Sequence, residues 1–325
     1  MFLQKHNIRK YITQSGVEFK NLQLTYQMVG KALGTAPIVL VHHALTGNSD
    51  VASDENGWWN TLVGFNKTID LNQYTVLSID VFGNGFNSTF PEGINYKAFT
   101  IYDIAQLFYS VVDHLGITNL FACIGGSIGG GISWEMAVQR PYFINKLIPI
   151  ATDWKASDWI IGHNHIQEQI LNQQDSGLET ARMMAMLFYR TPESFVEKFN
   201  RQRTKTNEDF KVNSWLDFHG DRLNKRYSID SYKMMNHLLA TLDITAHRTS
   251  FQEAVKPISS EIIQIGINSD LYFSASENKT TQHTLNVLGI QNSYFEIDSK
   301  HGHDAFLIEY NQLQTILKPI FNSTH

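Results

Sequence analysis

A serine surrounded by glycines is the residue of this sequence whose setting most directly suggests chemistry. Residues 124–131 read IGGSIGGG, so Ser127 lies among five glycines and residues 125–129 match the pattern G-x-S-x-G. Glycine in regular structure costs roughly 0.5–1 kcal/mol relative to alanine, so such a cluster needs a steric reason. A sharp turn from a strand into a helix supplies one, because side chains beside the serine would collide with neighbouring chain. The pattern therefore predicts a strained turn that presents a nucleophilic hydroxyl.

Two alternatives to a nucleophile would also account for the glycines. A flexible turn with an incidental serine is disfavoured, because apolar segments flank the cluster on both sides. A phosphate-binding loop is disfavoured by spacing, since the sequence has no GxxxxGK[ST] and GGSIGG does not fit G-x-G-x-x-G. A nucleophilic serine remains the favoured interpretation.

A serine nucleophile needs a base and an acid, which we expect further along the chain. The hydroxyl reacts poorly until a base removes its proton, and an acid must hold that base in one tautomer. In α/β-hydrolases the acid and then the histidine follow the serine, on loops after late strands. Asp270 follows the apolar run EIIQIGI, and both His301 and His303 follow the strand-like NSYFEID. Asp270 is the predicted acid, and spacing alone does not choose between the two histidines.

Backbone N–H groups should complete the site as an oxyanion hole. One donor would come from the residue after the serine, Ile128, and the other from a loop near the first strands. The stretch HHALTG, from His42, is the candidate loop. Removing one such donor costs on the order of 3 kcal/mol in the transition state. An ordinary strand-to-helix loop is the alternative, and the sequence leaves it open.

The elements around the serine predict how it is positioned. Short apolar runs, rich in β-branched residues and ending in polar or glycine residues, indicate buried strands. Helical spacing of apolar residues follows several of them, and one such helix, from Gly131, should stop before Pro141. The predicted strands are APIVLVHH, QYTVLSID, NLFACIGG, NKLIPIAT, EIIQIGI and NSYFEID, and the predicted helices are TIYDIAQLFYSVVDHLGI, GISWEMAVQRP and AFLIEYNQLQTILKPIF. This alternation predicts an α/β fold with a mostly parallel central sheet and helices on both faces.

A long polar stretch of helical period interrupts the alternation between about Trp154 and Phe251. Strand patterns return after it, so the first and last thirds of the chain should form one sheet. We therefore expect an α/β core from residues 1–153 and 251–325, with residues 154–250 inserted as a helical lid.

Composition limits the kinds of partner. The 325 residues are 42% hydrophobic and 18% charged, which suits a soluble globular protein. The 26 basic and 31 acidic residues give a net charge of −5, which offers no electrostatic basis for binding nucleic acid. Small-molecule substrates are the expected partners. The single cysteine, Cys123, and the absence of a secretory signal or of an apolar run of about 20 residues predict a cytoplasmic protein without a membrane span.

Stretches along nearly the whole chain resemble one family, the homoserine O-acetyltransferases, which are acyltransferases built on the α/β-hydrolase fold. The last of these stretches is the most specific, and by resemblance it selects His303 over His301 as the base. The stretches are HHALTGN, GWWNTLVG, FTIYDIAQ, VVDHLGI, GGSIGG, GLETARMMAMLFYR, VNSWLDFHGDRLNKRYSIDSY, GINSDLYF and IDSKHGHDAFLIE. The resemblance implies an α/β-hydrolase fold with a helical lid, and a homodimer formed through that lid.

The resemblance also implies a role for each catalytic group. Ser127 would be the nucleophile, Asp270 the acid that orients the base, and the N–H groups of Leu45 and Ile128 the oxyanion donors.

Three further residues would hold the acceptor amino acid by the same resemblance. Arg182 and Tyr189 match residues that bind the acceptor in this family, and Asp304 matches the residue that meets its amino group. Residues 182 and 189 are seven apart, two helical turns, so both side chains should lie on one side of a helix. An arginine fork suits a carboxylate.

The activity implied by the resemblance is transfer of an acetyl group from acetyl-CoA, as a co-substrate, to the side-chain hydroxyl of homoserine in methionine biosynthesis. No permanently bound cofactor and no metal are expected. A serine hydrolase that acts on small esters with the same triad is the main alternative, and a binding protein without catalysis is another.

Some positions depart from the family's usual pattern. They are Ile128, Gly131, Ile132, the stretch DVFGNGFNSTFP from Asp80, and a shortened segment between Leu171 and Gly177. Because they fall where the acyl pocket and its mouth are expected, the identity of the acyl group stays open.

Overall fold

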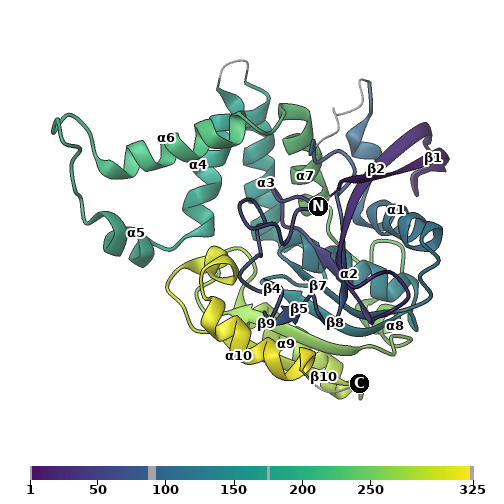
Figure 1. The fold of residues 1–325 in the computed structure, drawn as a ribbon. Coiled ribbons are helices and arrows are strands. Elements are labelled where there is room, and N and C mark those ends of the chain that lie inside the picture. The colour runs from purple at the N-terminus through teal and green to yellow at the C-terminus, as the bar shows by residue number, and fades with distance from the viewer. Residues whose placement is uncertain (1, 87–92, 174–175, 323–325) are drawn as a thin grey trace.

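The structure is a computed structural model that describes residues 2–86, 93–173 and 176–322, and its centre is a twisted eight-stranded sheet (Figure 1). The strand order is β1-β2-β6-β3-β7-β8-β9-β10. β1 and β2 pair antiparallel, β2 also pairs antiparallel with β6, and the remaining neighbours are parallel. The strands are β1 (Gln4–Ile12), β2 (Glu18–Gly30), β3 (Ile38–His42), β6 (Thr75–Ile79), β7 (Leu120–Gly126), β8 (Ile144–Ile150), β9 (Glu261–Ile267) and β10 (Asn292–Ile297), and a separate parallel pair is formed by β4 (Val63–Gly64) and β5 (Ile69–Asp70).

The central strands are buried on both faces, as their apolar runs predict. In β3, Leu40 packs in one hydrophobic cluster, while Val39 and Val41 pack in the other. Successive side chains of a strand point to opposite faces, so a strand covered on both sides must be apolar throughout. Each of the six predicted strands is present.

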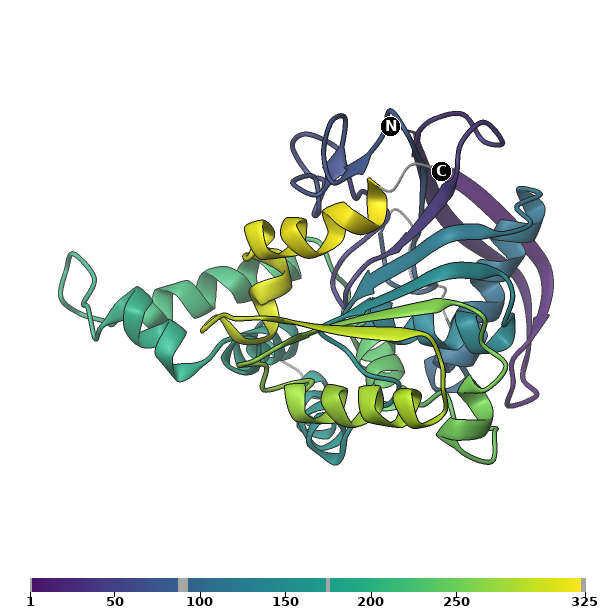
Figure 2. The same ribbon diagram turned by 90° about the horizontal axis from the view of Figure 1, so that it is seen from below.

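Helices cover the two faces. α1 and α2 pack in the cluster that contains Leu40, whereas α10 packs in the cluster on the other face. Figure 2 shows α9 and α10 on opposite sides of the edge strand β10. The bounds are α1 (Ile101–His114), α2 (Ile128–Gln139), α8 (Phe251–Val255), α9 (Ala275–Val287) and α10 (Tyr310–Phe321), with short 3-10 turns η1 (Tyr96–Ala98) and η2 (Gly302–Leu307).

Further helices lie between β8 and β9, within the stretch that the sequence assigns to a lid. They are α3 (Asp158–Leu171), α4 (Gly177–Tyr189), α5 (Pro192–Phe199), α6 (Lys211–Asn224) and α7 (Ile229–Ala240). α3 and α7 lie near the sheet, while α4, α5 and α6 extend away from it (Figure 1). Among the residues described, no helix is both long and apolar enough to span a bilayer.

Two predicted helix boundaries were wrong. The helix expected from Gly131 begins at Ile128, because the glycines after the serine are already helical. The helix expected over AFLIEYNQLQTILKPIF is divided, since η2 ends at Leu307 and α10 begins at Tyr310. Residues 87–92 and 174–175, which include part of DVFGNGFNSTFP and of the shortened lid segment, lie outside the described residues.

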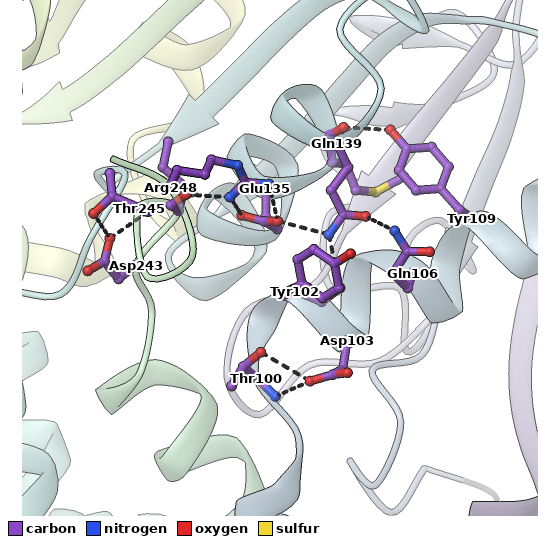
Figure 3. Close-up of polar contacts among 12 residues, drawn as sticks. Thr100, Tyr102, Asp103, Gln106, Tyr109, Glu135, Gln139, Asp243, Thr245 and Arg248 are labelled. Carbon is purple, nitrogen blue, oxygen red and sulfur yellow. Dashed lines mark hydrogen bonds and ion pairs between the residues drawn. The ribbon is translucent and has the colours of Figure 1, made fainter. Parts of the chain in front are cut away.

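The helix that follows Ser127 is fixed to the segment before α8 by a buried ion pair (Figure 3). Arg248 donates from Nη2 to Glu135 Oε1 at 2.9 Å and from Nη1 to Oε2 at 3.0 Å. Gln139 Nε2 adds a bond of 2.8 Å to the same carboxylate, and the Glu135 side chain is 1% exposed. This contact joins α2 to the segment between α7 and α8.

Candidate active site

The turn between β7 and α2 holds Ser127 in strained backbone geometry. Its φ of 56° and ψ of −130° lie in a region that residues with a side chain rarely adopt, at a cost of order 1–3 kcal/mol. The Ser127 N–H donates to the Ile150 carbonyl at 2.9 Å, which fixes the turn to β8. The strain expected from the glycine cluster is therefore present at the serine itself.

The glycines are present because a side chain at these positions would overlap with other atoms. A Cβ at Gly126 would lie 2.5 Å from Cε2 of Phe306. A Cβ at Gly129 would lie 2.7 Å from the His43 carbonyl oxygen and 2.8 Å from that of His42. Such distances are too short for real atoms, so the steric prediction is confirmed.

Ser127, His303 and Asp270 form one hydrogen-bonded row. His303 Nε2 lies 2.9 Å from Ser127 Oγ, and His303 Nδ1 donates to Asp270 Oδ2 at 2.8 Å. Asp270 Oδ1 accepts from the N–H groups of Tyr272 at 2.6 Å and Phe273 at 3.0 Å. With its Nδ1 proton directed at the carboxylate, the imidazole keeps its Nε2 lone pair facing the hydroxyl. All three side chains are buried.

The structure separates the two histidines that the spacing leaves equal. His301 Nδ1 is 2.9 Å from Ser194 Oγ on α5, while His303 points to Ser127. His303 is therefore the histidine of the row, as the resemblance implies.

The protonation of His303 reflects opposing influences. Burial lowers the pKa of the imidazole, but the charge of Asp270, its hydrogen bond and the nearby charge of Asp304 outweigh burial and raise the pKa above the usual 6.5. A raised pKa means that the imidazolium is favoured, which is the form an imidazole takes after accepting a proton.

The two candidate oxyanion donors follow two neighbouring strands, β3 and β7. Ile128 is the first residue of α2, so its N–H has no acceptor within the helix and lies at the positive end of the helix dipole. Leu45 lies in the loop after β3, and its carbonyl accepts from Tyr227 Oη, between α6 and α7, at 3.1 Å.

Asp80, which was not predicted as a site residue, holds the loop that contains Leu45 through hydrogen bonds to Ser49. Its Oδ1 accepts from the Ser49 N–H at 2.7 Å, and its Oδ2 accepts from Ser49 Oγ at 2.9 Å and from Thr25 Oγ1 at 2.6 Å. The carboxylate is 2% exposed and ends the strand run QYTVLSID. A charged residue directly after an apolar strand was the signal that could have identified it.

Two of the residues predicted to hold the acceptor, Arg182 and Tyr189, form a chain of contacts to His303. The guanidinium carbon of Arg182 lies 5.6 Å from the Tyr189 ring centroid, and the Tyr189 ring lies 5.7 Å from that of His303. Arg182 and Tyr189 are both on α4, and the contact between them shows that the seven-residue spacing places their side chains on one side of this helix. Asp304 accepts from Arg190 Nε at 2.9 Å, so a cation already neutralises this carboxylate.

A pocket of about 350 Å³ opens beside this chain of contacts. Its lining includes Arg182 from α4, Ala44 and Thr46 from the Leu45 loop, and Leu307 from the segment after His303.

Within the part of the chain that is described, no three His, Cys, Asp or Glu side chains are grouped so that they could hold a metal ion.

The sheet order and the Ser–His–Asp row are those of the α/β-hydrolase class, and a family model described as alpha/beta hydrolase fold matches residues 37–310. Curated relatives narrow the class. The homoserine O-acetyltransferase of Methanococcus vannielii is 34% identical over 94% of this chain and 70% of its own length. That of Cyclobacterium marinum is 31% identical over 95% of this chain and 92% of its own.

Solved structures agree with these relatives. The homoserine O-acetyltransferase of Staphylococcus aureus aligns with a TM-score of 0.85 and 25% identity over 100% of this chain and 96% of its own. Esterase E22 aligns with a TM-score of 0.87 and 17% identity over 98% of this chain and 100% of its own, a likeness of fold. The chain belongs to the homoserine O-acetyltransferase family and is an enzyme of that family.

Proposed function

We propose that this enzyme moves an acetyl group from acetyl-CoA to the side-chain hydroxyl of homoserine through an acyl-enzyme on Ser127. The observation that carries the proposal is the row from Ser127 Oγ to His303 at 2.9 Å and on to Asp270 at 2.8 Å. The relatives named homoserine O-acetyltransferase support the acceptor and the acyl group. The proposal assigns the reaction to methionine biosynthesis in the cytoplasm.

In the first half-reaction the acetyl group passes to the serine. Ser127 Oγ attacks the thioester carbonyl carbon while His303 Nε2 takes the hydroxyl proton. The negative charge that develops on the carbonyl oxygen is stabilised by the N–H groups of Ile128 and Leu45. The C–S bond then breaks, and the imidazolium returns its proton to the leaving thiolate, so that free CoA thiol departs.

In the second half-reaction the acceptor takes the place of the thiol. The homoserine hydroxyl gives its proton to His303 Nε2 and attacks the acetyl carbonyl of the acyl-enzyme. Collapse of this second tetrahedral intermediate breaks the ester bond to Ser127 Oγ, which recovers its proton from the imidazolium. The scheme is ping-pong because the first product leaves before the acceptor reacts.

Binding of the acceptor must let transfer outrun hydrolysis. Water, at about 55 molar, competes for the acyl-enzyme, whereas an acceptor held in attacking geometry reaches effective concentrations of about 10⁵ molar or more. We assign the acceptor carboxylate to the Arg182 fork and its ammonium to Asp304. Arg190 would then share the Asp304 carboxylate with the substrate.

The test compares thiol release from acetyl-CoA in the presence of homoserine, of serine and of no acceptor. We expect release that depends on homoserine, formation of O-acetylhomoserine by mass, and a protein mass increase of one acetyl group on Ser127 when the acceptor is omitted. Ser127→Ala should lose the adduct and about 10⁶-fold in kcat.

Two outcomes would contradict the proposal. Thiol release at one rate regardless of acceptor would identify a hydrolase instead. Homoserine-dependent release by Ser127→Ala at the wild-type rate would exclude the acyl-enzyme.

A further inference from the structure

A polar cluster is buried between α3 and the loop that follows β9. Tyr272 Oη lies 2.6 Å from His163 Nδ1 and 3.3 Å from Asn164 Oδ1. Gln167 Nε2 lies 3.4 Å from His163 Nε2 and donates to the Ala181 carbonyl of α4 at 3.0 Å. All four side chains are buried, although polar groups are costly to remove from water. The proposed reaction steps use none of these side chains, so the cluster calls for another role.

The Ala181 carbonyl fixes the direction of these hydrogen bonds. A carbonyl only accepts, so the amide nitrogen of Gln167 must face it, and the second N–H of that amide meets His163 Nε2. Nε2 therefore carries the lone pair, and Nδ1 carries the proton that is donated to Tyr272 Oη. The Tyr272 hydroxyl in turn donates to Asn164 Oδ1. Burial lowers the pKa of His163 to about 4, so the ring is neutral and this arrangement persists at neutral pH.

The helix that holds Tyr272 is itself fixed to two others. Asn236 Nδ2 of α7 donates to the Asn164 carbonyl of α3 at 2.9 Å. The bond from Gln167 ties α3 to α4, the helix that carries two of the residues assigned to the acceptor. The Tyr272 hydroxyl is thus bound to a frame of three helices.

Tyr272 also contacts both the acid and the base of the catalytic row. Its backbone N–H donates to Asp270 Oδ1 at 2.6 Å, and its ring centroid lies 5.3 Å from that of His303. Asp270 binds His303 through the other carboxylate oxygen, Oδ2. A shift of the Tyr272 backbone would therefore move the carboxylate and change its hydrogen bond to the imidazole.

We propose that Tyr272 is a positioning residue for the catalytic row, and that the hydrogen bond from His163 holds it in place, so that α3 sets the geometry of Asp270 and His303. The inference rests on the proposed function in one respect, which is that the row performs the chemistry. Tyr272 would act through Asp270 and through the packing of its ring on His303.

The experiment measures how fast Ser127 is acylated by p-nitrophenyl acetate, from the burst of p-nitrophenolate. This ester needs the row but neither acetyl-CoA nor homoserine. Tyr272→Phe removes only the hydroxyl. Because a misplacement of about 1 Å can cost about 100-fold in rate, we expect the acylation rate constant at saturation to fall about 10- to 100-fold. The ester concentration that gives half of this rate should stay unchanged.

The pH profile separates positioning from a loss of folded enzyme. Burial lowers the pKa of His303, whereas the charge of Asp270, its hydrogen bond and the charge of Asp304 raise it. A loosened Asp270 would raise it less, so the midpoint of the acylation rate should move to lower pH in Tyr272→Phe. Loss of folded enzyme would instead reduce the size of the burst and leave the midpoint in place.

Two substitutions of His163 test the source of the hold. Leucine has no donor, so His163→Leu should slow acylation about as much as Tyr272→Phe. The double variant should be no slower than either single one, because both changes remove the same bond. Asparagine keeps an N–H near the place of Nδ1, so His163→Asn should retain most of the wild-type rate.

Tyr294→Phe is the matched control. It also removes a tyrosine hydroxyl that donates a hydrogen bond, to Glu296 at 2.8 Å, but Tyr294 lies on the edge strand β10. The acylation rate and its midpoint should stay at the wild-type values in this variant.

Three results would overturn the inference. They are a wild-type rate and midpoint in Tyr272→Phe, equal rates in His163→Asn and His163→Leu, and a double variant whose loss is the product of the two single losses. The proposed function fails separately, because its failure appears as thiol release from acetyl-CoA that does not depend on homoserine, which leaves the ester burst in place.

Discussion

At the scale of single residues, the position of Ser127 depends on neighbouring glycines, because a side chain at Gly129 would overlap with adjacent backbone. The Gly129 Cα faces the backbone carbonyls of His42 and His43, which lead directly into the loop of Leu45. Backbone atoms cannot rotate away as side chains do. The position of the serine and that of one oxyanion donor are therefore linked through one glycine.

Gly129→Ala should damage both stability and rate. The added methyl overlaps two carbonyl oxygens, so we expect a loss of about 1–3 kcal/mol in the free energy of unfolding, measured by urea denaturation. Displacement of the Leu45 loop should reduce kcat by about 10- to 100-fold. Gly162→Ala is the control: a methyl added on the exposed side of α3 would meet no atom within 4 Å, and this variant should gain about 0.5–1 kcal/mol. Equal stability of the two variants would contradict the predicted overlap at Gly129.

The raised pKa of His303 predicts the pH dependence of the reaction. The base must be neutral to accept the serine proton, and a raised pKa means that more of the enzyme is protonated at a given pH. kcat/KM for acetyl-CoA should therefore increase with pH through a midpoint above 6.5.

Asp270→Asn tests the cause of that midpoint. The variant loses the charge that opposes burial, so its midpoint should move to lower pH while the rate falls by about 10⁴-fold. A pH profile of kcat/KM that keeps the wild-type midpoint would show that Asp270 does not set the pKa.

At the scale of elements, α2 is fixed at its first residue and again at Glu135. Its first residue follows the strained serine, and further along it Glu135 pairs with Arg248 (Figure 3). Burial raises the pKa of Glu135, while hydrogen bonds and charge from Arg248 oppose that rise. The pair thus offsets part of the cost of burying the carboxylate, and it joins the segment between α7 and α8 to the helix that follows Ser127.

Arg248→Met should destabilise the protein by about 3–5 kcal/mol, because it leaves a buried carboxylate without its cation. The folded-state pKa of Glu135 then rises further above the unfolded value, so the folded state binds more protons and stability falls as pH increases between the two values. Urea denaturation should show a larger loss at pH 8 than at pH 5. Glu135→Leu combined with Arg248→Met should recover most of the loss, and a double variant as unstable as the single one would contradict this.

At the scale of the whole molecule, the helices that extend away from the sheet between β8 and β9 present apolar side chains to solvent. Val196 on α5 is 64% exposed and Phe218 on α6 is 56% exposed, and both helices extend away from the core (Figure 1). The family resemblance implies dimerisation through this region, and burial of such side chains would favour it.

We expect the enzyme to sediment as a species of twice the chain mass. Val196→Lys combined with Phe218→Lys should shift it to the monomer, because two charges would have to be buried in the interface. Val287→Lys, on the core helix α9 where Val287 is 73% exposed, should leave the mass unchanged. A monomeric wild type, or a dimer that survives the double change, would exclude the lid as the interface.

The sequence by itself determined the local features of the protein. Short apolar runs predicted the central strands, and the glycines around Ser127 predicted the strained turn. Both features depend on burial and steric fit over only a few residues. The hairpin of β1 and β2 was not predicted, since the edge strand β1 and its neighbour β2 are rich in polar residues and lack a continuous apolar run.

Tertiary structure alone decided which distant groups meet. His301 and His303 are equivalent in the local pattern, and the path of the chain into η2 turns one toward α5 and the other toward Ser127. The same holds for two other contacts between distant parts of the chain. Asp304 pairs with Arg190, and arginines from α4 and α6 line one pocket. Such contacts depend on the order of strands and the placement of inserted helices, which no short stretch of sequence encodes.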